Sequence, residues 1–282
     1  MKLSRSLLIL IFSSFFSAIA IGSTVQKLSV GENGFVGHYY QQENDSSKQP
    51  VIVLGGSEGG IPTRLAKVIA ENGFPTLAVA YFKEDLLPGE LERIPLEYFE
   101  KARNWLQQKH PQSQHLTLVG WSKGAELSLL LASKDATYDR VVAIAPSSVV
   151  WPGILKDRQK TPDSSWTLEQ KALPFVTYNP TGAITSLLDL YTQSLENRGD
   201  NGNATIKTEN ISGSVFLYSG GMDEIWPSSL MSDDICQRME QNKASTCKHL
   251  DYPYLDHLLN YKMLDESEQL YRDFVTSIGS ED

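Results

Sequence analysis

The 282-residue chain predicts an α/β protein in which helices cover both faces of a mostly parallel sheet. Beyond residue 50, short and continuously apolar runs alternate with longer amphipathic segments, as expected when parallel strands are buried on both faces. Hydrophobic residues make up 41% of the chain and charged residues 21%, which excludes a disordered or fibrous chain. The 25 Lys and Arg residues against 34 Asp and Glu residues give a formal net charge of -9, which argues against nucleic-acid binding.

The first twenty residues have the pattern of a secretory signal peptide. Lys2 and Arg5 precede a largely apolar run, and Ala18-Ile19-Ala20 is a small-x-small cleavage site. We expect cleavage after Ala20, which leaves residues 21–282 as a single domain that is secreted or periplasmic. An uncleaved segment would anchor the chain in a membrane, and we expect a membrane partner only in that case.

Core strands are expected where apolar runs are bounded by turn residues. They are Val51–Leu54, Thr76–Phe82, Leu116–Val119, Arg140–Ala145, Val215–Tyr218 and Lys248–Tyr252. Phe35–Tyr40 is expected to add an antiparallel edge hairpin, with Asn44–Gln49 as a polar turn.

Helices are expected between these strands, with ends marked by proline, glycine and apolar spacing. They cover residues 62–72, residues 96–110, Ser122–Ser133, Ser228–Gln241 and Leu264–Ile278. Pro62 stands in the first turn of the first helix, and Gly73 follows its end.

The segment between Pro146 and Ile211 contains no expected strand of the sheet, and a connection of that length is unusual within a compact domain. We therefore expect a cap insertion at about residues 150–210, over the C-terminal edge of the sheet, with a helix around Ala183–Leu195. This cap is expected to influence the choice of substrate.

Cys236 and Cys247 are the two cysteines of the chain. In an exported protein their spacing suits one disulfide better than a metal site. Such a bond would join a helix to the strand that follows it. The alternative is a pair of buried free thiols.

The expected strand Leu116–Val119 leads into Gly120-Trp121-Ser122-Lys123-Gly124, a G-x-S-x-G pattern that precedes an expected helix. This is the arrangement of the nucleophile elbow, in which small residues flank a serine on a strained turn because the backbones crowd together. The sequence therefore predicts an α/β-hydrolase fold with Ser122 as the nucleophile. The backbone N–H of Lys123 is expected to be one donor of an oxyanion hole.

A second G-x-S-x-G pattern, Gly55-Gly56-Ser57-Glu58-Gly59, follows the first core strand. Ser57 is not favoured as the nucleophile, because no helix begins directly after it and its strand is not expected near the centre of the sheet. We expect this loop to supply the second oxyanion donor, from the backbone N–H of Ser57 or Glu58.

The acid and the base are expected in the order serine, acid, histidine, each after a strand. Asp223 follows a strand and a glycine-rich turn, and His257 follows the last strand, so they are the expected acid and base. Asp233 and Asp234 are expected to be carboxylates on a helix surface. The other histidines lie too early, or beside or inside strands: His38, His110, His115 and His249.

The sequence motifs imply no cofactor. No His or Cys cluster has the spacing of a metal site, and no phosphate-binding glycine motif opens a helix. We expect no metal and no nucleic-acid partner. The expected partner is a small-molecule acyl ester or thioester.

Longer motifs surround these residues: Gly55–Gly60, Gly73–Tyr81, Ile94–Ala102 (IPLEYFEKA), Gly120–Leu127 (GWSKGAEL) and Asp223–Ser228 (DEIWPS). They resemble the catalytic domain of the acyl-CoA thioesterase and bile acid-CoA:amino acid N-acyltransferase family, which is related to dienelactone hydrolases. The resemblance runs from about residue 50 to the C-terminus. It implies an α/β-hydrolase fold in which Ser122, Asp223 and His257 match the triad positions of the family.

Two features differ from the animal members of that family. A short segment precedes the core where those members carry an immunoglobulin-like domain, and export would place the chain where coenzyme A is scarce. A serine in place of the cysteine of the amino-acid transferases favours hydrolysis over transfer. We therefore expect a serine acyl hydrolase that cleaves a thioester or carboxylic ester through an acyl-enzyme. The alternatives are a dienelactone-hydrolase-like or general carboxylesterase, an acyltransferase, and a protein of this fold that binds a ligand without turnover.

Overall fold

The computed structural model describes residues 24–41, 47–157, 159–199, 202–241 and 245–279. Residues 1–20, for which we expect a signal peptide, lie outside the described part of the chain. In the described ranges, no helix is both long enough and apolar enough to cross a membrane.

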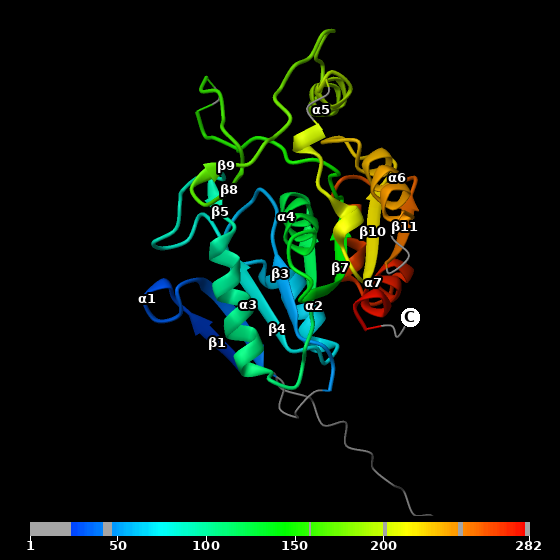
Figure 1. Cartoon of the computed structure of the whole chain (residues 1–282). Coiled ribbons are helices and arrows are strands. Elements are labelled where there is room, and N and C mark those ends of the chain that lie inside the picture. Colours follow the sequence, from blue (N-terminus) through cyan, green and yellow to red (C-terminus); the bar gives the residue numbers. More distant parts are fainter. Residues whose placement is uncertain (1–23, 42–46, 158, 200–201, 242–244, 280–282) are drawn as a thin grey trace, which may run out of the picture.

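An eight-stranded, mostly parallel sheet runs through the molecule (Figure 1). Its spatial order is β1 (Thr24–Leu28), β2 (Val36–Gln41), β4 (Thr76–Ala80), β3 (Val51–Leu54), β6 (Leu116–Trp121), β7 (Tyr138–Ile144), β10 (Ser214–Gly220) and β11 (Thr246–Tyr252). The strands from β4 to β11 are parallel, whereas β1 and β2 form an antiparallel edge. The predicted fold class is confirmed, and each expected core strand is present with ends shifted by a few residues.

Helices cover both faces of the sheet because successive residues of the central strands point to opposite faces and both sets are apolar. One face carries α3 (Glu97–Lys109), α4 (Lys123–Ala132) and α6 (Ser228–Met239), and the other carries α2 (Thr63–Glu71) and α7 (Gln269–Gly279). In β6, for example, Leu118 packs with the first group of helices and Val119 with the second. The sheet is therefore the middle layer of a three-layer structure.

The N-terminal edge differs from the expected hairpin. β2 pairs with β1 and β4 and not with β3, so the chain between β2 and β3 does not close a hairpin between neighbouring strands. Residues 44–46 of the expected turn Asn44–Gln49 lie outside the described part of the chain. The sequence does not predict β1 because its residues are exposed except for Leu28, which leaves no apolar pattern. A short helix, α1 (Val30–Asn33), connects β1 to β2.

The last helix begins later than the sequence predicts, at Gln269 rather than Leu264. The Asp265 carboxylate accepts hydrogen bonds from the N–H (3.0 Å) and the hydroxyl (2.7 Å) of Ser267. These bonds hold a turn that separates the 3-10 helix η3 (Leu259–Leu264) from α7.

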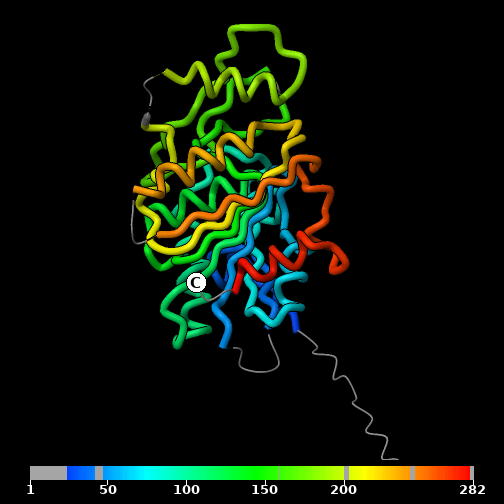
Figure 2. The backbone as a smooth tube through the Cα atoms, turned by 90° about the vertical axis from the view of Figure 1, so that its right-hand side faces the viewer, coloured from blue at the N-terminus to red at the C-terminus, as the bar shows by residue number. Residues whose placement is uncertain are grey.

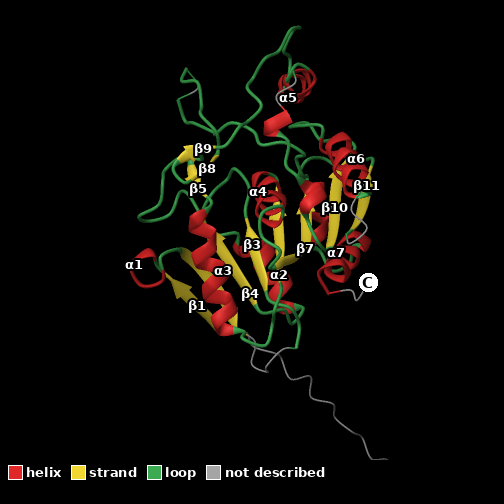
Figure 3. Cartoon of the chain, viewed as in Figure 1, coloured by secondary structure: helices red, strands yellow, loops and turns green. Residues whose placement is uncertain are grey.

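The segment between β7 and β10 projects beyond the end of the sheet (Figure 1), and the side view agrees (Figure 2). It is mainly loop (Figure 3), with α5 (Leu187–Glu196), the 3-10 turns η1 (Gly202–Ala204) and η2 (Thr208–Asn210), and two short strands, β8 (Trp166–Leu168) and β9 (Lys171–Ala172). These strands form a separate three-stranded sheet with β5 (Ile94–Pro95). The sequence does not predict this sheet because its strands are too short to show a periodic pattern.

Aromatic side chains connect α5 to the rest of the structure. The Tyr191 ring of α5 meets the Trp151 ring edge-on, with 4.7 Å between centroids, and the Trp226 ring at 5.7 Å. Trp151 and Trp226 are both buried. The cap is therefore packed against the same tryptophan, Trp226, that follows the expected acid Asp223.

Cys236 of α6 and Cys247 of β11 form a disulfide, with their Cα atoms 5.2 Å apart. The expected bond is confirmed, and the alternative of two free thiols is excluded. The bond joins an edge strand of the sheet to a helix that packs on it.

Replacing both cysteines (Cys236→Ala with Cys247→Ala) should lower the free energy of unfolding by about 2 to 3 kcal/mol, because the bond restricts the unfolded chain. Urea unfolding followed by circular dichroism, with and without a phosphine reductant, measures the effect. The reductant should destabilise the wild-type chain and leave the double variant unchanged. Equal sensitivity of the two proteins would contradict the expected contribution of this bond.

Candidate active site

Ser122 lies at the junction between β6 and α4, with φ 55° and ψ -116°. L-residues rarely adopt a positive φ, and such strain persists where surrounding packing fixes the backbone. The Ser122 N–H donates to the Ile144 carbonyl of β7 (2.8 Å), and its carbonyl accepts from the N–H groups of Ala125 (2.9 Å) and Glu126 (3.0 Å). The serine is therefore fixed between a neighbouring strand and the first turn of the helix.

The glycines on either side of Ser122 are required by close packing of the backbones. A Cβ on Gly120 would overlap the carbonyl group of Gly124, and a Cβ on Gly124 would overlap the carbonyl oxygens of Leu54 and Gly55. This crowding is the physical reason for small residues at both positions.

His257 follows β11 and lies between Ser122 and Asp223. Its Nε2 is 2.9 Å from Ser122 Oγ, and its Nδ1 is 2.9 and 2.8 Å from the two carboxylate oxygens of Asp223. The three residues are buried, with exposed fractions of 8% for Ser122, 5% for His257 and 6% for Asp223. The structure thus brings together the serine, base and acid expected from chain order.

The turn after β10 fixes the orientation of Asp223. Its Oδ1 accepts from the N–H groups of Ile225 (2.9 Å) and Trp226 (3.1 Å), and its Oδ2 accepts from the Ser228 hydroxyl (2.6 Å). Gly220 allows the histidine loop to come close, because a Cβ there would overlap backbone carbonyl oxygens of that loop. The carboxylate is therefore held in place by donors other than the imidazole.

The loop after His257 has a strained backbone. Residues 259–261 all have positive φ, of 48°, 50° and 56°. The Asp256 carboxylate stabilises this loop by accepting two of its backbone N–H groups, at 2.9 and 2.8 Å. Asp256, which directly precedes the histidine, thus helps to fix the position of the imidazole.

The glycine-rich loop 55–60 lies against the nucleophile. A Cβ on Gly56 would be 3.3 Å from the Cβ of Ser122. Ser57 and Glu58 are exposed and line the same pocket as Ser122. Lys123 begins α4, so its N–H belongs to the first helical turn, whose N–H groups have no acceptor within the helix. Lys123 and the loop that carries Ser57 and Glu58 therefore lie next to Ser122.

A second Ser–His–Asp arrangement lies between β10, β11 and α6, and the sequence does not reveal it. Ser219 Oγ is 2.6 Å from His249 Nε2, and His249 Nδ1 is 2.8 Å from the exposed carboxylate of Asp233. The Ser219 hydroxyl also donates to Asp251 (2.7 Å), and Ser219 is completely buried. A serine that is completely buried in this way is not accessible to a substrate.

A pocket of about 510 Å³ opens beside Ser122 and His257. Its walls are mostly apolar and come from the start of α2, the end of β6 and η3: Ile61, Pro62, Leu65, Trp121, Leu258, Tyr261 and Leu264. The guanidinium of Arg64 lies over the Tyr261 ring at this pocket, 5.0 Å from its centroid. Within the described part of the chain, the cap at residues 150–210 contributes no wall to it.

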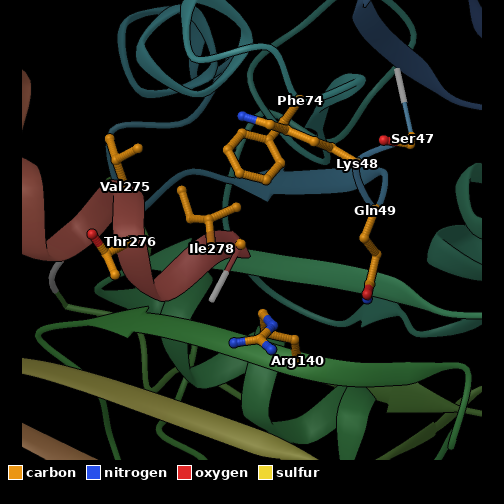
Figure 4. A pocket seen from close by; sticks show the side chains of 9 residues that line it. Ser47, Lys48, Gln49, Phe74, Arg140, Val275, Thr276 and Ile278 are labelled. Carbon is orange, nitrogen blue, oxygen red and sulfur yellow. The ribbon is translucent and has the colours of Figure 1, made fainter. Parts of the chain in front are cut away.

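A second hollow, of about 550 Å³, lies at the opposite end of the strands, near the starts of β3 and β4, and Figure 4 shows the side chains that line it. Its lining combines basic and apolar side chains, including Lys48, Arg140, Phe74 and Ile278. Ligands of open parallel sheets bind at the carboxyl ends of the strands. The pocket beside Ser122 is therefore the candidate active site.

Ser122, His257 and Asp223 are linked by hydrogen bonds in the arrangement of serine, imidazole and carboxylate that serine hydrolases use. Among the residues that the structure describes, no group of three or more His, Cys, Asp or Glu side chains is placed to hold a metal ion. By its fold and the position of this site, the protein is an α/β hydrolase.

The family follows from comparison with known proteins. Residues 94–274 match the family described as BAAT / acyl-CoA thioester hydrolase C terminal, and the chain belongs to this family. The resemblance expected from the sequence motifs is thereby confirmed.

Curated relatives carry related names. Acyl-coenzyme A thioesterase 6 of Mus musculus is 32% identical over 215 residues, which are 74% of this chain and 48% of that protein. Acyl-coenzyme A amino acid N-acyltransferase 2 of Mus musculus is 28% identical over 243 residues, which are 85% of this chain and 56% of that protein. The chain spans about half the length of the curated relatives it matches.

Solved structures agree on the fold. An esterase of Pyrococcus furiosus superposes with a TM-score of 0.57 at 13% identity, covering 96% of each chain. A candidate dienelactone hydrolase from Klebsiella pneumoniae gives a TM-score of 0.55 at 12% identity, covering 92% of this chain and 100% of that chain. At these identities the likeness establishes the fold and nothing further.

Gly120→Ala should lower the free energy of unfolding by about 3 kcal/mol or prevent folding, because the new methyl group overlaps backbone atoms that cannot move away. Gly89→Ala is the matched control, since a Cβ there meets nothing within 4 Å. The control should change stability by less than about 0.5 kcal/mol. Urea unfolding compares the two, and similar effects would show that the turn at Ser122 tolerates a side chain.

Proposed function

We propose that this chain is a serine acyl hydrolase that cleaves a thioester or carboxylic ester through an acyl-enzyme intermediate. The observation that carries the proposal is the series of hydrogen bonds from Ser122 Oγ through His257 to Asp223, beside an apolar pocket. Family membership supports it, because the description of the matched family names acyl-CoA thioester hydrolases beside BAAT.

In the proposed mechanism, Ser122 Oγ attacks the carbonyl carbon of the substrate while His257 Nε2 accepts the hydroxyl proton. Asp223 bonds to Nδ1, which directs Nε2 at the serine and stabilises the imidazolium that forms. His257 then gives the proton to the leaving oxygen or sulfur. A water molecule hydrolyses the acyl-enzyme by the same proton route, which returns the serine to its starting state.

The charge that develops on the substrate oxygen is bound, in this proposal, by the backbone N–H of Lys123 and by that of Ser57 or Glu58. The position of Lys123 at the N-terminus of α4 supports this role, because the helix dipole favours negative charge there. The close approach of Gly56 to Ser122 supports the role of the second segment. Losing one such donor typically costs about 10²- to 10³-fold in rate.

The substrate class follows from the pocket and the charge of the chain. Apolar walls suit the hydrocarbon part of an acyl group. A formal net charge of -9 disfavours the capture of a polyanionic coenzyme, so a neutral ester or thioester is the first candidate. The names of the relatives indicate two alternatives for this chain, which are hydrolysis of acyl-coenzyme A thioesters and transfer of an acyl group to an amino acid.

We place the mature protein outside the cytoplasm, either secreted or periplasmic. The signal-peptide pattern of residues 1–20 supports this location. The Cys236–Cys247 disulfide supports it independently, because such bonds persist in oxidising compartments.

Ser122→Ala should reduce the hydrolysis of short p-nitrophenyl esters by at least about 10³-fold, because it removes the nucleophile. Ser57→Ala is the matched control and should stay within about threefold of the wild type, since the backbone N–H of residue 57 is retained. Labelling with a fluorophosphonate should require Ser122. A folded wild-type chain that neither hydrolyses esters nor takes up the label would favour ligand binding without turnover.

Ile61→Trp should reduce kcat/KM for long acyl chains by about 10-fold or more and spare acetyl esters, because the indole fills the pocket beside Ser122. A series of p-nitrophenyl esters and acyl-CoA thioesters of increasing chain length measures this change and ranks the two leaving groups. Leu187→Ala, at an exposed site in the cap, should leave the series unchanged. Unaltered selectivity of the Ile61 variant would show that the acyl group binds elsewhere.

A further inference from the structure

We propose that Glu126 is a positioning residue for the reaction, because its buried carboxylate fixes the two segments that supply the oxyanion hole. This inference rests on the serine-hydrolase function proposed above. Glu126 lies in the first turn of α4 and is not one of the residues that line the pocket beside Ser122. Its effect on the reaction would therefore act through its neighbours.

The Glu126 carboxylate is completely buried and accepts hydrogen bonds from three residues. Lys123 Nζ donates to both oxygens (2.8 and 2.7 Å), and Oε1 also accepts from Trp166 Nε1 (2.7 Å) and the Trp151 N–H (3.3 Å). Lys123 is buried as well, with 1% exposure. A buried ion pair of this kind is tolerated when the remaining donors and acceptors around it are also bonded.

The ion pair is connected directly to the nucleophile. The Glu126 N–H donates to the Ser122 carbonyl (3.0 Å), so the first turn of α4 is tied to the serine. Lys123 is the residue whose backbone N–H we propose as an oxyanion donor. Because its side chain is held by Glu126, rotation of the peptide group that carries this N–H is restricted.

Trp166 extends the network to the second segment of the oxyanion hole. Its ring packs against the Tyr81 ring, with 5.7 Å between centroids, and the Tyr81 hydroxyl donates to the Gly55 carbonyl (2.5 Å). Gly55 begins the loop that would supply the N–H of Ser57 or Glu58. The Glu126 carboxylate therefore links Lys123 to the loop that begins at Gly55. Because Trp166 lies in β8, it also links them to the cap.

The electrostatics explain why the network acts as a unit. Burial raises the pKa of the Glu126 carboxyl, and the positive charge of Lys123 and the bonds from Trp166 and Trp151 oppose this rise. Burial likewise lowers the pKa of the Lys123 ammonium, and Glu126 opposes that change. Each group depends on the other to remain charged, so a change at one disturbs the bonds made by both.

Glu126→Gln tests the proposal, because glutamine keeps the shape of the side chain but removes the charge and one acceptor. We expect kcat per active site to fall about 10- to 100-fold with KM within about twofold, as for a defect confined to the transition state. The substrate is a short p-nitrophenyl ester, and active sites are counted by fluorophosphonate titration. A trifluoromethyl ketone, which forms an oxyanion on the serine, should bind more weakly by the same factor.

Trp166→Phe is a milder variant for the case in which Glu126→Gln does not fold. It removes one N–H donor and keeps an aromatic ring against Tyr81, and we expect kcat to fall about 3- to 10-fold. Tyr218→Phe is the matched control, because it also removes one buried hydrogen bond, from its hydroxyl to Ser277 Oγ (3.1 Å). The control should leave kcat and ketone binding unchanged.

The outcomes separate the two proposals. If the variants at Glu126 and Trp166 lose only thermal stability while kcat per titrated site and ketone affinity stay at the wild-type values, the positioning role is overturned and the hydrolase function stands. A wild-type chain that is folded but inactive on every ester and thioester, and unreactive toward the fluorophosphonate, overturns both.

Discussion

Close contact among the backbone segments of β3, β6 and α4 holds Ser122 in its strained conformation. Gly124 of α4 lies against the carbonyl groups at the end of β3, and Gly120 of β6 lies against Gly124, with no room for a Cβ at either glycine. The helix is therefore seated where β3 and β6 end, and its first turn is directed at the space beside the serine hydroxyl. The histidine loop, the glycine-rich loop and the apolar pocket are all arranged around a hydroxyl whose position this contact sets.

The core strands and helices could be predicted because their apolar patterns are continuous and their ends are marked by proline and glycine. Ser122, Asp223 and His257 could be proposed because strand ends and chain order in a parallel sheet leave few choices. β1 could not be predicted, since it is mostly exposed. β5, β8 and β9 could not be predicted either, because they are too short to show a periodic pattern. The contribution of η3 to the pocket walls could not be predicted, because the loop after His257 bends through residues with positive φ, which no local sequence pattern indicates.

Contacts between distant segments account for the remaining differences between sequence and structure. A glutamate three residues after a lysine on a helix is ordinarily a solvated pair, but packing of the cap onto α4 buries Glu126 and Lys123 completely. Ser219 shows the converse, because its hydroxyl also forms a hydrogen bond to a histidine that contacts a carboxylate, yet the serine is completely buried. What distinguishes Ser122 from Ser219 is the tight turn and the adjoining pocket, and not the three side chains by themselves.

The Cys236–Cys247 bond lies between the elements that carry the acid and the base. Asp223 precedes α6 and His257 follows β11, so the disulfide joins the helix after one residue to the strand before the other. β11 is an edge strand with a hydrogen-bonded neighbour on one side, and strands of this kind fray more readily than central ones. Fraying of β11 would carry the imidazole away from the serine while the core remained folded. The covalent bond therefore limits how far the strand before His257 can separate from the helix that follows Asp223.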